Sequence, residues 1–245
     1  MKKTRKETIK ELKKEFPNIE SLYKSKCVNW TGITKDTDEL YSELIANELL
    51  RNLKKFDEIP MVTRTNSYCR ENHCNIEIDI CKSNRDEENF AKRITGLTLE
   101  SLGLIKDYQI PLKDTQADKG LGKIDLISFN RKTKTLYLIE LKYKENKETL
   151  LRATLESYTY YKIVDKIKLI NDCINNQKFV LTKVFNQVNI DKIEIKSAVL
   201  VVPGCNAYTE LEELEFGKRP KLKALSLALD VSYFTLELMT HETIL

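Results

Sequence analysis

Two acids and a lysine within residues 122–143 have the types and spacing to bind a metal ion and cleave a phosphodiester. Asp125 lies in an apolar segment typical of a β-strand, and Glu140 and Lys142 end a second such segment. Alternate side chains of a strand share one face, so Glu140 and Lys142 point the same way, roughly 6–7 Å apart. Two converging carboxylates suit a hard cation such as Mg²⁺. A lysine beside them can orient a water or stabilise negative charge on a phosphate.

A polar turn, residues 130–135, is expected to bring these two segments together. It contains no apolar residue and has the length of a hairpin connection. Pairing across it would place Asp125 beside Glu140 and Lys142. Asp125 and Glu140 lie fifteen positions apart in the sequence. The sequence pattern is therefore an acid followed, about fifteen residues later, by Glu-x-Lys. This pattern favours metal-assisted phosphodiester cleavage.

The same residues resemble a known family. Asp125 followed by Glu140-Leu141-Lys142 is similar to the motif of the PD-(D/E)XK nuclease superfamily, in particular the branch of the RecB nuclease domain and archaeal Holliday-junction resolvases. Ile124 stands where that family often has proline. The resemblance covers residues 86–203, about half of the chain. It implies an α/β fold with a restriction-endonuclease-like αβββαβ core, in which helices flank a mixed central sheet.

The resemblance also implies roles for individual residues. Asp125, Glu140 and the Leu141 carbonyl would hold Mg²⁺ or Mn²⁺, and Lys142 would position the attacking water. Glu88, in the first turn of a helix predicted from about residue 86 to 102, would be an accessory ligand through water. Glu87 is the alternative to it. Either acid could instead serve only the dipole of that helix.

A tyrosine-rich segment, residues 148–170, predicts one long helix, because it lacks Gly and Pro and its apolar residues recur at helical spacing. Arg152, Glu156 and Tyr160 fall on one face of it. The RecB-like branch has Gln-x-x-x-Tyr there, so Glu156 and Tyr160 are similar to catalytic positions. Arg152, with Lys144, would contact nucleic acid. The alternative is an amphipathic helix whose Arg152–Glu156 pair is a weak surface ion pair.

The remaining elements give the order α-β-β-β-α-β for the core. A strand is expected near residues 108–111, and residues 196–203 form a continuous apolar run typical of a strand buried on both faces. We expect two regions: an N-terminal extension, 1–85, and the nuclease-like domain, 86–245. Further predictions are helices at 2–16 and from 36 or 37 to about 55, strands at 61–65, 75–82 and 225–238, and a basic loop at 217–223.

The cysteines leave an alternative open. Cys69 and Cys74, with Cys81 seven residues on, could bind zinc, but the spacing is not a common ligand pattern. Without a secretion signal we expect free, reduced thiols.

Composition sets broad limits. The 245 residues carry a net charge of +4, which permits but does not argue for nucleic-acid binding. No apolar run is long enough to span a bilayer, so a cytoplasmic protein with no membrane contact is expected. The leading hypothesis is a metal-dependent nuclease acting on nucleic acid, in the first place DNA, and many relatives dimerise, so a homodimer stays open. The alternatives are a nuclease-fold binding or regulatory module without important cleavage activity, and an unrelated α/β protein in which the three residues lie apart.

Overall fold

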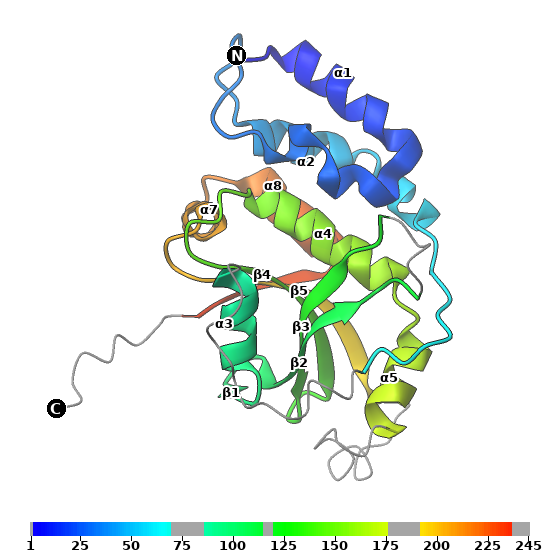
Figure 1. Cartoon of the computed structure of the whole chain (residues 1–245). Coiled ribbons are helices and arrows are strands. Elements are labelled where there is room, and N and C mark those ends of the chain that lie inside the picture. The colour runs from blue at the N-terminus through cyan, green and yellow to red at the C-terminus, as the bar shows by residue number, and fades with distance from the viewer. Residues whose placement is uncertain (1, 70–85, 115–119, 176–191, 237–245) are drawn as a thin grey trace, which may run out of the picture.

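A computed structural model describes residues 2–69, 86–114, 120–175 and 192–236. The described elements form an α/β protein with helices on both faces of one sheet (Figure 1). In chain order these elements are α1 (Arg5–Glu15), the 3₁₀ helices η1 (Phe16–Lys24) and η2 (Lys26–Asn29), α2 (Tyr41–Leu50), η3 (Leu53–Glu58), α3 (Asp86–Ile94), β1 (Thr98–Leu99), β2 (Gly103–Pro111), β3 (Lys123–Asn130), β4 (Thr135–Lys142), α4 (Leu150–Ile163), α5 (Lys166–Asn175), β5 (Glu194–Val201), α7 (Asn206–Glu215), α8 (Pro220–Ala228) and β6 (Val231–Thr235).

The sheet is mixed, and its six described strands follow one another in chain order. Strands β1 to β4 pair antiparallel, whereas β5 runs parallel to β4 and β6 parallel to β5. The turn at residues 131–134 closes the β3–β4 hairpin, with Asn130 opposite Thr135 and Leu126 opposite Ile139. The predicted hairpin is therefore present.

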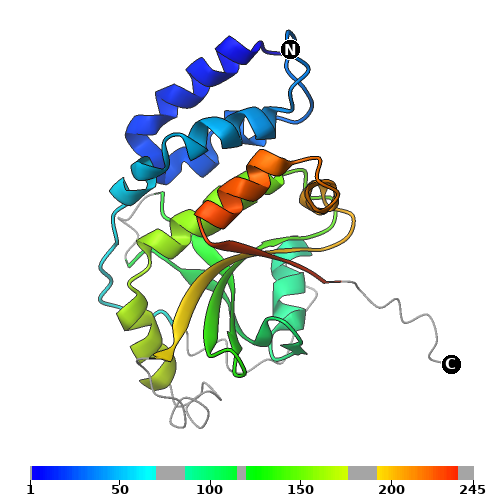
Figure 2. The same cartoon turned by 180° about the vertical axis from the view of Figure 1, so that it is seen from behind.

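Two apolar cores lie on the two faces of the sheet, because alternate residues of each strand point to opposite sides. On β4, Leu136 and Leu138 join the core beneath α4, while Tyr137, Ile139 and Leu141 join the core beneath α3. Figure 2 shows α8 on the same side of the sheet as α4. Every residue of β4 is buried, as expected for a strand covered on both faces.

The N-terminal extension packs on the α4 side and shares its core. Leu22 of η1 and Leu49 of α2 belong to the same buried cluster as Leu151 and Leu155 of α4. In Figure 1 the helices α1 and α2 form a further layer over α4 and α8. The extension therefore lies directly against the helix that carries several predicted site residues.

The single helix predicted at 148–170 is wrong, because the structure has two helices there. Val164 is extended (φ −66°, ψ 133°), which ends α4. Asp165 then caps α5, since its carboxylate accepts the Lys168 N–H at 3.0 Å. Local side-chain capping of this kind interrupts a helix even where the apolar pattern continues.

The strand predicted at 225–238 is also wrong over its first half. Residues 220–228 form α8, which begins with Pro220 in its first turn and buries Leu222 and Leu225. Only Val231–Thr235 is a strand, β6. Alternating leucines suggested a strand, but the spacing of Leu225 and Leu229 also fits one face of a helix.

Smaller predictions also need correction. Residues 61–65 form no strand, although the Val62 N–H donates to the Ile163 carbonyl at 2.8 Å. The helix predicted at 86–102 ends at Ile94, and the second N-terminal helix begins at Tyr41 rather than near residue 36. The predicted strand at 75–82 lies outside the described residues.

Candidate functional site

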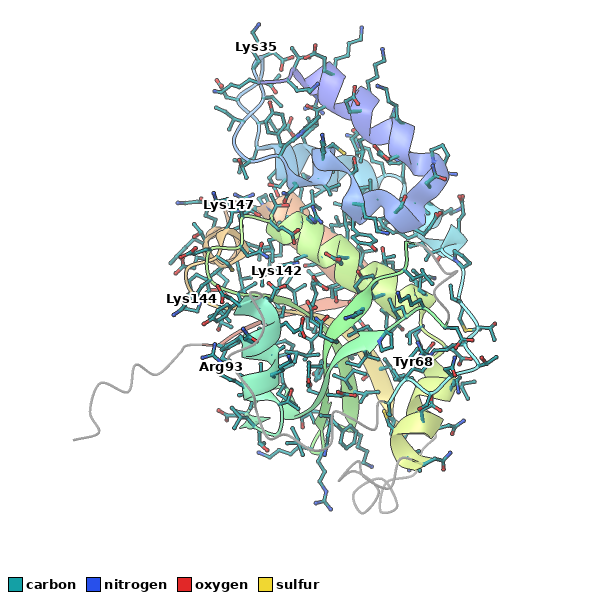
Figure 3. The ribbon with its side chains drawn as sticks, in the orientation of Figure 1. Lys35, Tyr68, Arg93, Lys142, Lys144 and Lys147 are labelled. Carbon is teal, nitrogen blue, oxygen red and sulfur yellow. The ribbon has the colours of Figure 1, made fainter. Side chains whose placement is uncertain are left out.

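Asp125, Glu140 and Lys142 converge in one pocket at the end of the β3–β4 hairpin. The pocket has a volume of about 330 Å³. All three residues are buried: Asp125 is 8% exposed, Glu140 4% and Lys142 3%. Figure 3 places Lys142 between α3 and α4. The alternative of an unrelated α/β protein predicted that these three residues lie apart. That prediction is wrong, because all three line one pocket. The pocket is lined by Glu87, Gln109, Lys123, Asp125, Glu140, Lys142, Asn146, Glu148, Arg152, Glu156 and Tyr160.

Lys142 is surrounded by carboxylates from β4, from the segment before α4 and from α4 itself. Its ammonium lies 2.6 Å from Glu140 Oε1 and 2.6 Å from Glu148 Oε2. A third carboxylate oxygen, Glu156 Oε2, lies 3.7 Å away. Burial lowers the pKa of Lys142, but the charges of Glu140, Glu156 and Glu148 outweigh it and raise the pKa well above its ordinary value. Lys142 therefore stays protonated at neutral pH and acts as a cation.

Asp125 is held by two hydrogen bonds. The Gln109 side chain donates to Oδ1 at 2.9 Å, and the Leu141 N–H donates to Oδ2 at 3.0 Å. Burial raises the pKa of Asp125 to about 7, against the lowering effect of Lys142. Burial and the charges of Asp125 and Glu156 likewise raise the pKa of Glu140. These acids are thus costly to ionise together, and a cation between them would relieve that cost.

This donor set fits a hard divalent cation. Asp125 and Glu140 offer carboxylate oxygens, which Mg²⁺ and Mn²⁺ prefer. The Leu141 carbonyl as a ligand stays a prediction. In the described ranges, no three His, Cys, Asp or Glu side chains are arranged to enclose a metal ion by themselves. The pocket can therefore supply part of a coordination shell, with water or a phosphate oxygen completing it.

Glu87 lines this pocket, whereas Glu88 does not. Glu88 forms an ion pair with Lys92 at 3.2 Å, on the helix α3 itself. Glu87 accepts hydrogen bonds from Tyr143 N at 3.3 Å and Asn146 Nδ2 at 3.2 Å. Burial raises the pKa of Glu87. The predicted acid from this helix is therefore better assigned to Glu87, the alternative that the sequence left open.

Arg152, Glu156 and Tyr160 lie on the predicted face of α4, turned toward the pocket. The Tyr160 hydroxyl donates to Glu156 Oε1 at 2.8 Å. Arg152 pairs with Glu148 at 3.0 Å, and its Nε is buried without a hydrogen-bond partner. A guanidinium in the wall of a pocket is suited to bind an anion such as a phosphate.

Lys144 lies next to the site rather than in it. It is exposed and lines an adjoining pocket of about 460 Å³ that shares Glu87, Gln109 and Asn146 with the first. In Figure 3, Lys144 and Lys147 lie farther from the sheet than Lys142. The two pockets therefore adjoin each other at these three residues.

Sequence reasoning missed four pocket residues: Gln109, Lys123, Asn146 and Glu148. Gln109 has a backbone φ of +51°, in the left-handed region that such a residue rarely adopts. Asn146 accepts the Glu148 N–H at 2.8 Å and so fixes the start of α4 beside Lys142. Glu148 was predicted only as the start of a helix. Glu148 is the one missed residue for which the sequence held a signal, because it lies four residues before Arg152 and can form an i, i+4 ion pair with it.

Only Cys69 of the three cysteines proposed as zinc ligands lies among the described residues. The Cys69 and Cys173 sulfurs lie 3.8 Å apart. Cys74 and Cys81 lie outside the described residues. Among the described helices, none has the length and apolar character to cross a membrane.

Comparisons with known proteins found no match to this chain among family models, curated proteins or solved structures.

Proposed function

We propose that this protein is a metal-dependent nuclease that hydrolyses phosphodiester bonds in nucleic acid, in the first place DNA. The observation that carries the proposal is the convergence of Asp125, Glu140 and a protonated Lys142 in one pocket, delivered by adjacent strands. The sheet supports it. Strands β2, β3 and β4 are antiparallel, β5 is parallel to β4, and α3 and α4 lie on opposite faces. A restriction-endonuclease-like core, which the sequence resemblance implies, would have its strands and helices in this order.

Asp125 and Glu140 would hold Mg²⁺ or Mn²⁺, which supplies Lewis-acid polarisation of the scissile phosphate. Lys142 cannot accept a proton while it carries its own, so it orients the attacking water and stabilises charge on the phosphate oxygens. The water oxygen forms a bond to phosphorus and releases one proton to solvent while the ester P–O bond breaks. The leaving oxygen takes up one proton from solvent, which gives one phosphate monoester end and one hydroxyl end. Arg152 Nε would bind a phosphate oxygen.

The test is cleavage of plasmid, single-stranded DNA, branched DNA and RNA by purified protein with Mg²⁺, with Mn²⁺ and with chelator. Asp125→Asn, Glu140→Gln and Lys142→Met should each abolish cleavage while the circular dichroism spectrum is retained. Glu212→Gln, on the exposed side of α7, is the matched control for Glu140→Gln. Cutting that persists in all three variants would place the activity elsewhere. Binding of DNA without cutting would favour the alternative, a nuclease-fold binding or regulatory module.

A further inference from the structure

The N-terminal extension reaches the candidate site through Tyr23, at the end of η1. The Tyr23 ring meets the Tyr160 ring edge to face, with centroids 5.5 Å apart and planes at 76°. Tyr23 is only 4% exposed. Burial raises the pKa of both phenols. Tyr160 is buried as well, so the contact between the two rings lies inside the core and not at the surface.

A continuous series of contacts therefore runs from the extension to the central lysine. Tyr160 donates to one oxygen of Glu156 at 2.8 Å, and the other oxygen of Glu156 faces the Lys142 ammonium at 3.7 Å. Gly122 also adjoins Tyr160, because an added Cβ there would clash with the Tyr160 hydroxyl oxygen. The Tyr23 ring and the Gly122 main chain therefore both restrict the position of the Tyr160 side chain.

The extension also fixes the beginning of α4. The Thr149 N–H donates to Asn29 Oδ1 at 2.8 Å, and its hydroxyl donates to the Val28 carbonyl at 2.6 Å. Thr149 is the N-cap of α4 and directly follows Glu148, which contacts Lys142 at 2.6 Å. The extension thus holds α4 at two points, and each of them adjoins a carboxylate that contacts Lys142.

We propose that Tyr23 is a positioning residue for Lys142, so that the N-terminal extension completes the active site instead of merely covering it. The inference rests on the proposed nuclease function. Its physical basis is preorganisation: a catalytic group works at full rate only when neighbouring hydrogen bonds and packing hold it in its productive orientation. Tyr23 acts through Tyr160 and Glu156 and touches neither the ligands Asp125 and Glu140 nor the substrate.

The test is Tyr23→Leu in the full-length protein, which removes the ring that contacts Tyr160 and keeps an apolar side chain in its place. We expect kcat to fall about tenfold or more, in the range typical of residues that orient a catalytic group, with KM and Mn²⁺ affinity unchanged. Tyr41→Leu is the matched control, because Tyr41 is buried in the same extension but its ring contacts Trp30 and not Tyr160. Unchanged kcat in Tyr23→Leu would overturn the inference.

A second measurement separates failure of this inference from failure of the proposed function. The ammonium of Lys142, assigned in a lysine ¹⁵N NMR spectrum by its loss in Lys142→Met, should shift in Tyr23→Leu and not in Tyr41→Leu. A wild-type protein that cuts nothing overturns the proposed function, whereas an unmoved Lys142 signal overturns the role of Tyr23. Because Tyr23 acts through the bond from Tyr160 to Glu156, Tyr23→Leu should have no further effect on that signal in a Tyr160→Phe background. An additive effect would contradict the inference.

Discussion

The Lys142 ammonium lies 2.6 Å from the Glu140 carboxylate, and both side chains are about 95% or more buried. Taking two charges out of water is costly, so a buried pair persists only where each charge is compensated. Here Glu148 and Glu156 also contact Lys142, and one cation is therefore shared among three acids. This excess of acid is the main electrostatic property of the site, and it leads to the first two predictions.

Removing the lysine should destabilise the protein. We expect Lys142→Met to lower the free energy of unfolding at pH 8 by about 3–5 kcal/mol, as for breaking other buried ion pairs. At pH 5 the loss should be smaller, because protonated carboxyls no longer need the cation. Urea denaturation at both pH values measures this. Lys218→Met, at an exposed lysine, should stay within about 0.5 kcal/mol of wild type. Equal losses at the two pH values would contradict the account.

Asp125 should make the metal-free protein less stable as the pH rises. Burial raises its pKa to about 7 in the folded state, whereas the ordinary value is about 3.9. The folded protein then binds the proton more tightly, so stability falls as the pH rises from about 4 to about 7 and changes no further above that. In chelator, Asp125→Asn should gain about 1–4 kcal/mol relative to wild type between pH 4 and pH 8. Parallel stability curves would show that the carboxyl is not perturbed.

The same variant tests metal binding independently of cleavage. Millimolar Mn²⁺ should raise the melting temperature of wild-type protein at pH 8, because a ligand that binds only the folded state stabilises it. Asp125→Asn should lose most of that increase, and Glu212→Gln should keep it. An equal increase in all three proteins would mean that the ion binds elsewhere.

Gly122 should be intolerant of a side chain only while Tyr160 is present. A Cβ there would lie 2.0 Å from the Tyr160 hydroxyl oxygen and 2.8 Å from Cζ. We expect Gly122→Ala to cost about 1–3 kcal/mol of stability, as overpacking does. In a Tyr160→Ala background the same substitution should cost little. Thermal denaturation of the four proteins measures this coupling, and a cost that is the same in both backgrounds would rule out the contact.

Arg219 should stabilise the packing of the C-terminal helices on the extension. The sequence predicted a basic loop at 217–223, but Arg219 is buried and pairs with Glu213 at 2.6 Å and Glu210 at 3.4 Å. Its guanidinium also bonds to Ser42 of α2. Arg219→Ala should cost about 3–5 kcal/mol, because it leaves buried acids uncompensated. The neighbouring Lys218→Ala is the control, and an equal effect of both would contradict this role.

Local pattern predicted the centre of the site well. Asp125, Glu140 and Lys142 lie on one hairpin. Strand alternation fixes the face to which each side chain points, and the short turn brings the two strands together, so the sequence was sufficient to predict that the three residues converge. Gln109 could not be found, because its approach to Asp125 depends on an irregular register of β2 against β3. Glu87 and Glu88 are neighbours on one helix, and only the docking of α3 against Tyr143 and Asn146 decides which of them faces the pocket.

The extension was the hardest part to interpret. Its contacts with the site run over long sequence separations, such as Asn29 with Thr149 and Tyr23 with Tyr160. Periodicity describes an element by itself and does not identify its partner. The break between α4 and α5 depended on one capping residue, Asp165, within a pattern that otherwise continues.

The strands are arranged in space in the order in which they occur in the chain, and this has a consequence for the folding pathway. Strands β1 to β4 can pair one after another, because each lies next to its neighbour in the chain. Contacts between segments close in sequence form fastest, because closing a short loop loses little chain entropy. Asp125 and Glu140 would then be brought together early, before α3 and α4 dock and add Glu87 and Glu156. Until η1 and α4 cover them, these two carboxylates face water and repel one another weakly. The electrostatic cost of burying the pocket acids therefore arises only in the last stage of folding.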